Sequence, residues 1–301
     1  MLVSEIDIVS PTSLNECLSI ISKKGTQHRL IAGGTDAVVR MKEGKWRPET
    51  WINIKGINEL RYIKEKDGAI HIGPLTTHTD MIHSPLLQKK ADVLVEAARE
   101  VGAIQMQNMG TIGGNIGTAS PAGDTIPALS VLGAAIELCS ISTKRLVPIE
   151  EFFLGPGRTV LKQNEMITNI IFQPQNENEI GIFQKLGPRK AQSISIVNVA
   201  ISLIMGKERQ CLGGKIAFGS VAPTIIRAKK CESILTLKPL TDEFIQNIAK
   251  IAWKEVMPIT DVRATAEYRR DMASSLLERG LYRLMRRWET DASVKLGRKK
   301  S

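Results

Sequence analysis

The amino-acid sequence predicts an α+β fold divided into two or three domains, and three observations support this prediction. The chain has 301 residues, which is large for a single hydrophobic core. Roughly its first sixty residues alternate between strand and helix patterns, whereas short strands with one longer helix follow from Tyr62. From Glu179 the pattern changes again, to strands followed by two long helical segments.

The N-terminal part is predicted to be a compact βαβαβ unit. Ser13 and Glu16 have the spacing of a helix capping box, and Gly25 is expected to end that helix. Thr35 or Asp36 can cap the second helix. The expected elements are a strand around Ile6 and Ile8, a helix over 13–25, a strand over 28–32, a helix to about Met41 and a strand over 50–54.

In the rest of the chain the predicted strands and helices are less regularly spaced. Asp124 is expected to cap a helix. A long loop over 110–124 is rich in Gly, Asn and Thr, which is typical of functional loops. The other expected elements are strands over 70–72, 135–138, 183–185, 194–200 and 215–219, helices over 84–101, 125–133, 241–256 and 265–288, and a disordered basic tail. The expected divisions are therefore 1–60, 61–176, 177–288 and 289–301.

Composition limits the function classes that fit the chain. Apolar residues make up 43% and charged residues 24%, which is ordinary for a soluble globular protein. No apolar run approaches the ~20 residues that span a bilayer, and the start lacks the basic and apolar regions of a secretory signal. Membrane insertion and secretion are therefore not expected. The four cysteines are Cys17, Cys139, Cys211 and Cys231, and none of them has C-x-x-C spacing. We therefore expect buried thiols in a reducing cytoplasm and no metal site.

The net charge of +10 raises the alternative of a nucleic-acid-binding protein. Half of it lies in residues 261–301, which hold eleven Lys or Arg against six Asp or Glu. No zinc finger, RNA-recognition signature or basic stripe with interleaved aromatics accompanies this segment, so no nucleic-acid partner is expected. We interpret it as a solvated face or a docking surface for an acidic subunit. Apolar spacing predicts that its helix buries one face and turns five arginines outward: Arg269, Arg270, Arg283, Arg286 and Arg287.

Two glycine turns about eighty residues apart carry the main functional signal. They read Ala32-Gly33-Gly34-Thr35-Asp36 and Thr111-Ile112-Gly113-Gly114-Asn115. Unhindered successive N–H groups form a concave nest that suits phosphate oxygens. Two such turns suggest a pyrophosphate bound from two sides, and hence a dinucleotide. The G-x-G-x-x-G pattern of the ordinary nicotinamide-binding fold is absent, so that fold is disfavoured.

These turns also resemble a known family. The stretches Ala32–Asp36, Asn108–Ile116 and Pro121–Asp124 resemble the FAD-binding medium subunit of the molybdenum hydroxylases, the xanthine dehydrogenase and carbon monoxide dehydrogenase flavoprotein family. The resemblance covers about residues 4–288 and includes further stretches at 152–157, 165–167, 185–191, 217–224 and 261–270. It implies a two-subdomain FAD-binding fold of the vanillyl-alcohol oxidase (PCMH) type, followed by a smaller α+β C-terminal domain.

The resemblance implies a set of FAD-binding residues. Asp124 would meet the adenosine ribose, Ile167 would pack at the adenine or flavin side, and Lys185 would lie near the flavin pyrimidine. The alternatives are a plain helix N-cap for Asp124, a core position for Ile167 and a surface lysine for Lys185. The pyrophosphate would lie against Leu30, Ile31, Ala32, Gly33, Gly34, Thr35, Asp36, Ala37, Thr111, Ile112, Gly113, Gly114, Asn115 and Thr118.

Two departures from the family pattern and one histidine cluster complete the set of candidates. Gln107 stands where the family usually has Arg, so a positive contact with the ligand is lost there. The cysteine-bearing insertion that carries an extra cluster in some relatives is missing. The three histidines, His71, His78 and His83, are interpreted as ordinary surface or loop residues. No catalytic triad can be assembled from the sequence.

The implied function is that of the FAD-carrying subunit of a xanthine dehydrogenase-like complex. Electrons would pass from a molybdopterin centre and two-iron two-sulfur clusters on partner subunits through FAD to NAD⁺ or another acceptor. The partners would be an iron–sulfur subunit and a molybdopterin-binding large subunit, in a dimer of heterotrimers. The alternatives are a carbon monoxide or aldehyde/N-heterocycle dehydrogenase medium subunit, a stand-alone FAD oxidase, and a non-catalytic docking protein. The outward arginines would then meet an acidic patch on the iron–sulfur subunit.

Overall fold

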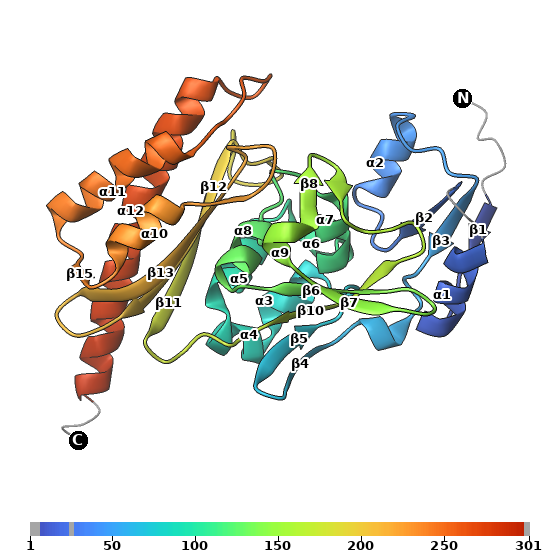
Figure 1. Cartoon of the computed structure of the whole chain (residues 1–301), viewed down its shortest axis with the longest axis horizontal. Coiled ribbons are helices and arrows are strands. Elements are labelled where there is room, and N and C mark those ends of the chain that lie inside the picture. The colour runs from blue at the N-terminus through green and yellow to red at the C-terminus, as the bar shows by residue number, and fades with distance from the viewer. Residues whose placement is uncertain (1–6, 24–26, 298–301) are drawn as a thin grey trace.

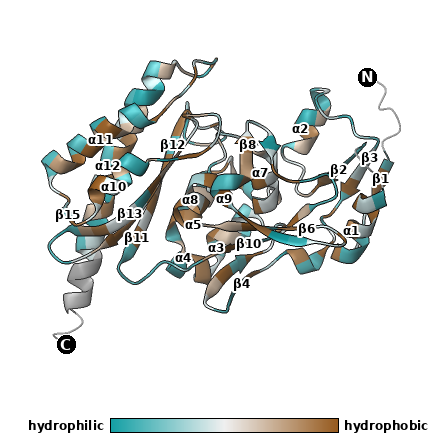
Figure 2. Cartoon of the chain, in the orientation of Figure 1, coloured by the Kyte–Doolittle hydropathy of each residue, from teal (hydrophilic) through white to brown (hydrophobic). Residues whose placement is uncertain are grey.

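The protein consists of three sheet-based units that follow one another along its long axis (Figure 1). The computed structural model describes residues 7–23 and 27–297, with the backbone alone described from residue 291 on. Each unit combines a sheet with helices, which confirms the predicted α+β class. Apolar residues predominate along the strands of the C-terminal sheet, whereas α11 and α12 carry both apolar and polar residues (Figure 2).

The N-terminal unit is the predicted βαβαβ arrangement. Its three strands are parallel in the order β1-β3-β2, as right-handed crossovers through short helices require. The Ser13–Glu16 pattern forms only half of a capping box, because the Glu16 carboxylate accepts from Thr12 N at 2.8 Å. Ile6 and Gly25 lie outside the described residues. The elements are β1 (Asp7–Val9), α1 (Leu14–Lys23), β2 (His28–Ile31), α2 (Ala37–Lys42) and β3 (Thr50–Asn53).

The middle unit is an antiparallel sheet in the order β4-β5-β10-β6-β7, covered by a set of short helices. The strands are β4 (Ile63–Lys66), β5 (Ala69–Ile72), β6 (Ala135–Cys139), β7 (Lys144–Pro148), β8 (Phe153–Gly155), β9 (Arg158–Thr159) and β10 (Met166–Phe172). The helices are η2 (Asn58–Leu60), α3 (His78–His83), α4 (Pro85–Lys90), α5 (Asp92–Arg99), α6 (Ile104–Met109), α7 (Ile112–Thr118), α8 (Thr125–Val131) and α9 (Ile149–Phe152).

Two predictions for the middle unit were wrong. The helix predicted over 84–101 starts as expected, with Ser84 as its N-cap, but it is divided into α4 and α5 at Ala91, which leaves helical geometry at φ −158°. The long loop over 110–124 contains helix α7. Three glycines in its seven residues concealed this helix, because each glycine costs about 1 kcal/mol of helix propensity relative to Ala.

The C-terminal unit is an antiparallel sheet covered on one side by long helices. Its elements are β11 (Glu179–Leu186), β12 (Val197–Met205), β13 (Gln210–Gly219), β14 (Ile226–Arg227), α10 (Lys229–Leu235), β15 (Lys238–Pro239), α11 (Asp242–Glu255) and α12 (Ala266–Gly297). The strand predicted over 194–200 begins only at Val197. The disordered tail predicted from residue 289 is helical through Gly297, because polar composition alone does not end a helix and no Gly or Pro interrupts it before that residue. Residues 298–301 lie outside the described chain.

The C-terminal sheet is buried on both faces, which joins the two larger units. Successive residues of β12 alternate between two apolar clusters: Ala200 packs in the core of the middle unit, whereas Val199 and Ile201 pack under α11 and α12. Helices α5 and α8 of the middle unit cover the face opposite α12. The amino end of β12 is thereby held beside Asp124, next to helix α7 and the carboxyl end of β2.

The predicted outward arginines of α12 are mostly turned inward. Its apolar stripe is buried as predicted, including Leu277, Leu281 and Leu284. However, Arg283 and Arg287 bind Glu96 and Asp92 of helix α5 in the same chain. Arg269 is buried, and Arg270 lies over the Trp253 ring at 5.5 Å from its centroid. The acidic side chains that Arg283 and Arg287 meet therefore belong to α5 of the same chain, and of the five arginines Arg283 and Arg286 are exposed.

Candidate functional site

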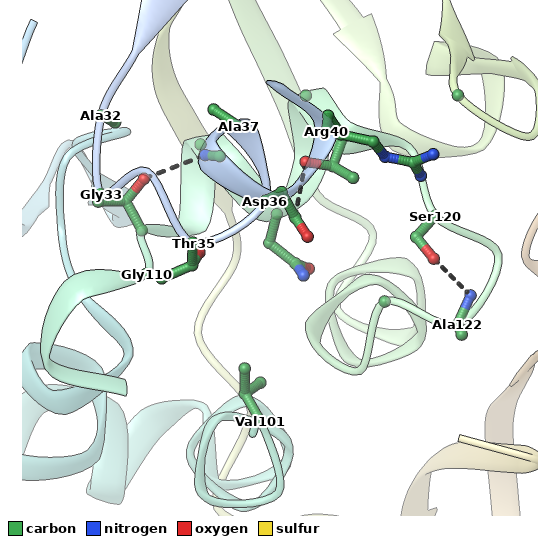
Figure 3. A pocket seen from close by; sticks show the side chains of 18 of the residues that line it. Ala32, Gly33, Thr35, Asp36, Ala37, Arg40, Val101, Gly110, Ser120 and Ala122 are labelled. Carbon is green, nitrogen blue, oxygen red and sulfur yellow. Dashed lines mark hydrogen bonds between the residues drawn. The ribbon is translucent and has the colours of Figure 1, made fainter. Parts of the chain in front are cut away.

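A cavity of about 1310 Å³ lies where the three units meet. This volume exceeds the ~300–1,000 Å³ of ordinary small-ligand pockets, so the cavity can hold a dinucleotide-sized molecule. Its walls come from the β2–α2 turn, from α7 and the turn after it, and from loops of the C-terminal sheet. Figure 3 shows how the first two of these walls face one another.

The first glycine turn provides free hydrogen-bond donors. Among the described residues, the backbone N–H groups of Gly33, Gly34, Thr35 and Asp36 donate to no acceptor. The turn is held tightly, because a Cβ atom on Gly33 would lie only 1.7 Å from the carbonyl oxygen of Met109. Only glycine allows the two segments to approach this closely. The turn therefore has the predicted character of an anion-binding nest.

The second glycine turn differs from the predicted nest. Its N–H groups are already used: Ile112 N donates to Thr76 O at 3.0 Å, Gly113 N to Pro74 O at 2.9 Å and Gly114 N to Thr111 Oγ1 at 3.1 Å. The turn is instead the first part of α7, whose Ile112 and Ile116 are buried in the core. Gly114 and Gly117 lie on the cavity wall and leave its surface free of side chains. A ligand can therefore approach the helix backbone closely.

The polar side chains of these turns hold the walls together. The Thr118 hydroxyl donates to the Asp36 carboxylate at 2.9 Å, which joins α7 to the turn before α2. Asn115 accepts from the Thr125 hydroxyl at 2.7 Å, which joins α7 to α8. The cavity walls are thus pre-formed, and binding a ligand does not require these groups to be ordered.

Asp124 and Lys185 contact each other at the edge of the cavity. Lys185 Nζ lies 2.6 Å from Asp124 Oδ2, and their side chains are only 4% and 8% exposed. Ser195 and Asn198 donate to the other carboxylate oxygen at 2.6 and 2.9 Å. Burial raises the pKa of the Asp124 carboxyl, whereas Lys185 and the two polar side chains act to lower it. The alternatives of a plain N-cap and a surface lysine are therefore excluded, since Asp124 makes no capping bond.

The cavity brings together nearly all of the residues that the sequence predicted. Two residues of that set do not line it. Ile112, the first residue of α7, is buried in the core, and Lys185 forms the ion pair with Asp124. Ile167 lines the wall and is also 7% exposed, so the core position and the ligand contact coincide. Gln107 does not line the cavity, because its amide nitrogen donates to the carbonyl oxygens of Arg99 and Val101 at the end of α5.

Sequence reasoning missed several wall residues. Arg40 lines the cavity from α2 and Trp46 from the loop after it, and no pattern marked either of them. His78 is buried at 2% exposure, which contradicts its interpretation as a surface residue, and burial lowers its pKa to about 4. The C-terminal loops contribute further side chains to the wall, none of which had been proposed as a ligand-binding residue: Arg189, Ser193, Ser195, Ser220, Asp261, Arg263 and Arg269.

Asp261 and Arg269 organise the C-terminal wall. Arg269 donates to Asp261 at 2.7 Å and to the carbonyl oxygens of Ile196 and Ser220 at 2.9 and 2.8 Å. Burial opposes ionisation of Asp261, but N–H groups and the Arg269 guanidinium outweigh it and lower its pKa to about 2. This ion pair therefore persists at neutral pH and fixes the loops on which Ser195 and Ser220 stand.

Other kinds of site were sought across the described part of the chain. Among the side chains described, those of residues 7–23 and 27–290, no three His, Cys, Asp or Glu gather in a group that could hold a metal ion. None of the helices described is long and apolar enough to cross a bilayer. The four cysteines are buried and unpaired. The cavity is thus the principal candidate site.

Comparison with known proteins agrees with the geometry of this cavity. Residues 4–174 match the family described as the FAD-binding domain in molybdopterin dehydrogenase, and residues 183–284 match the CO dehydrogenase flavoprotein C-terminal domain. The nicotinate dehydrogenase FAD-subunit of Eubacterium barkeri is 29% identical over 279 residues, 91% of this chain and 94% of the relative. A putative xanthine dehydrogenase FAD-binding subunit of Escherichia coli (strain K12) is 30% identical over 257 residues, 84% of this chain and 87% of the relative.

A carbon monoxide dehydrogenase is similar in both sequence and structure. The medium chain from Hydrogenophaga pseudoflava is 32% identical over 274 residues, 90% of this chain and 94% of the relative. A solved structure of carbon monoxide dehydrogenase from this organism matches with a TM-score of 0.91 at 30% identity and covers 95% of this chain and 99% of that one. The chain therefore belongs to the family of FAD-binding subunits of the molybdopterin dehydrogenases.

Proposed function

We propose that this chain is the FAD-carrying subunit of a xanthine dehydrogenase-like complex in the cytoplasm. It would receive electrons from iron–sulfur clusters on a partner subunit and pass them to NAD⁺ or another acceptor. The observation that carries the proposal is the cavity at the junction of the three units, with unused N–H groups on one wall and a glycine surface on another. FAD, when bound, exchanges electrons both singly and in pairs.

The residues present fit FAD in three respects. The N–H groups of the first turn suit pyrophosphate oxygens, and the glycine face of α7 lets the ligand lie against the backbone. The extent of the cavity from β2 to the C-terminal loops suits a ligand with an anionic centre and two ring systems. The chain's own share of the chemistry is to bind and orient this group and to limit its access to water.

The proposed roles of Asp124 and Lys185 are constrained by their contact. A carboxylate offers about four acceptor sites, and Asp124 already uses three of them for Lys185, Ser195 and Asn198. We propose that Asp124 accepts one hydroxyl of the adenosine ribose and not both. Lys185 would then influence the ligand through Asp124 and through the position of β11.

The substrate of the complex would be set by its molybdopterin-binding subunit. Relatives of this chain are named for nicotinate, xanthine and carbon monoxide, at 29, 30 and 32% identity. A carbon monoxide or aldehyde/N-heterocycle dehydrogenase is therefore the alternative within the same class. A nucleic-acid-binding role is less favoured, because ion pairs within the chain already occupy several of the C-terminal arginines.

The absorption spectrum of the purified full chain tests the proposal. We expect flavin bands, release of FAD on denaturation and reduction of the bound flavin by NADH in the absence of oxygen. The chain alone should oxidise no purine, aldehyde or carbon monoxide. A folded, colourless protein that binds no added FAD would overturn the proposal, and flavin that NADH fails to reduce would exclude NAD⁺ as the acceptor.

A further inference from the structure

The cationic side chains on the cavity wall differ in whether they are already paired. Arg269 and Arg263 bind Asp261, and Arg189 donates to the carbonyl oxygens of Ala191 and Gln192. On the N-terminal side of the cavity, the Arg29 guanidinium lies over the Trp46 ring, 4.3 Å from its centroid. These contacts hold the groups in place and reduce their availability for a ligand.

Arg40 is different. Among the described residues its guanidinium forms no hydrogen bond, ion pair or ring contact. Glu43, three residues further on, attracts it only at longer range, because that exposed carboxylate pairs with Lys45. The Arg40 side chain is half-buried and lines the cavity. Lys162 also lines the cavity without an ion pair, but it is exposed. Taking a guanidinium partly out of water without a partner is unfavourable, so such a group on a cavity wall points to an anionic ligand.

The position of Arg40 relates it to the first glycine turn. Its backbone N donates to Asp36 O at 2.9 Å, so it stands one helical turn beyond the nest. In Figure 3 its side chain extends from α2 towards the side of the cavity that carries Ser120 and Ala122. The Thr118–Asp36 hydrogen bond brings α7 to the same place. Arg40 therefore stands beside the two walls that are proposed to enclose the pyrophosphate.

The cavity also requires a positive charge at this place. The N–H groups of the first turn are neutral, and the Gln107 side chain is uncharged and turned towards the end of α5. A pyrophosphate linking two nucleoside moieties carries two negative charges. Transferring it from water to a partly buried site is costly unless a cation compensates it. Arg40 is a half-buried cation on this wall that forms no ion pair with any of the described residues.

We propose that Arg40 binds the pyrophosphate of FAD through its guanidinium and supplies the positive charge on this wall of the cavity. This inference rests on the proposed FAD-binding function. A guanidinium is suited to the role because its planar set of N–H donors can bind two phosphate oxygens at once.

The test is a binding titration of the full-length apoprotein with FAD, ADP and adenosine. Arg40→Gln should weaken FAD and ADP binding about tenfold to a hundredfold, the range that corresponds to loss of a hydrogen bond to a charged group. Adenosine, which lacks the pyrophosphate, should bind equally to both proteins. The salt dependence of FAD binding should also be smaller in the variant, because one charge contact is gone. Arg40→Lys should restore part of the affinity.

Lys42→Gln is the matched control, because it removes a positive charge from the same helix at an exposed position that does not line the cavity. It should leave all three affinities unchanged. The ligand-free melting temperature of Arg40→Gln should be close to that of the original chain, since Arg40 forms no ion pair with the described residues and its attraction to the exposed Glu43 is weak. Equal FAD affinity in Arg40→Gln, or a parallel loss of adenosine binding, would overturn the inference. Failure of the unaltered chain to bind FAD would instead refute the proposed function.

Discussion

The Lys185 ammonium lies 2.6 Å from the Asp124 carboxylate, and this contact joins two units of the fold beside the cavity. Lys185 stands on β11 of the C-terminal sheet, whereas Asp124 precedes α8 of the middle unit. Because both side chains are more than nine-tenths buried, neither charge can be compensated by water. The pair therefore makes the wall of the cavity dependent on the docking of the C-terminal unit.

Removing one partner of this pair should be strongly destabilising. Lys185→Met leaves the Asp124 carboxylate buried without its cation, and we expect a loss of about 3–5 kcal/mol in the free energy of unfolding. The measurement is urea denaturation at neutral pH. Lys190→Met, at an exposed position on the following loop, is the control and should change the stability by less than about 0.5 kcal/mol. Equal stability of the two variants would show that the pair is not energetically coupled.

Gly33→Ala should disrupt the first turn. The added methyl group would lie 1.7 Å from the carbonyl oxygen of Met109, so the turn or the end of α6 must move. We expect a loss of at least about 3 kcal/mol of stability and loss of FAD binding. Gly213→Ala in β13 is a suitable comparison, because nothing lies within 4 Å of its added methyl group. Retention of full stability and FAD content in Gly33→Ala would contradict the close approach of the two segments.

Gly114→Val and Gly117→Val should separate binding from folding. A Cβ atom on Gly114 meets only Thr111 Oγ1, at 3.0 Å, and one on Gly117 meets nothing within 4 Å. Both positions line the cavity, so valine should occupy the space of the ligand. We expect apoprotein with an unchanged melting temperature, because valine is no worse than glycine in a helix. Stoichiometric FAD in both folded variants would exclude α7 from the binding site.

The contact between Arg287 and Asp92 should contribute to stability in a pH-dependent way. Burial raises the pKa of the Asp92 carboxyl, while Arg287 acts to lower it. Arg287→Ala should therefore destabilise the protein by about 1–2 kcal/mol at neutral pH, where the carboxylate is charged. The loss should shrink as the pH falls through the raised pKa of Asp92, because the protonated carboxyl needs no cation.

The comparison for this prediction is Arg286→Ala. Arg286 is exposed, and no ion pair involving it occurs in the described chain. This variant should change the stability by less than about 0.5 kcal/mol at either pH. Urea denaturation at neutral and mildly acidic pH measures both variants. A pH-independent loss in Arg287→Ala would mean that its bond to the Gly181 carbonyl oxygen, at 3.1 Å, dominates.

Local sequence signals predicted most of the elements and the ligand-facing turns. The apolar spacing of Leu277, Leu281 and Leu284 predicted the buried face of α12, because a helix of 3.6 residues per turn brings these positions together. The glycine pairs predicted the cavity wall. The errors lie where local signals mislead: the glycines of α7 concealed a helix, and no Gly or Pro marks the break at Ala91 between α4 and α5.

The sequence by itself determined the α+β class, the βαβαβ start and the first glycine turn, since each depends on residues within a few positions of one another. Only the tertiary structure decided what the charged side chains contact. Lys185 meets Asp124 across 61 residues, and Arg287 meets Asp92 across 195. Which groups pair depends on how whole units dock against one another. Docking buries one face of each element, and a charged side chain buried there is stable only where it meets a compensating group. For the same reason Arg40 remained unmarked until the fold placed it, unpaired, on the wall of the cavity.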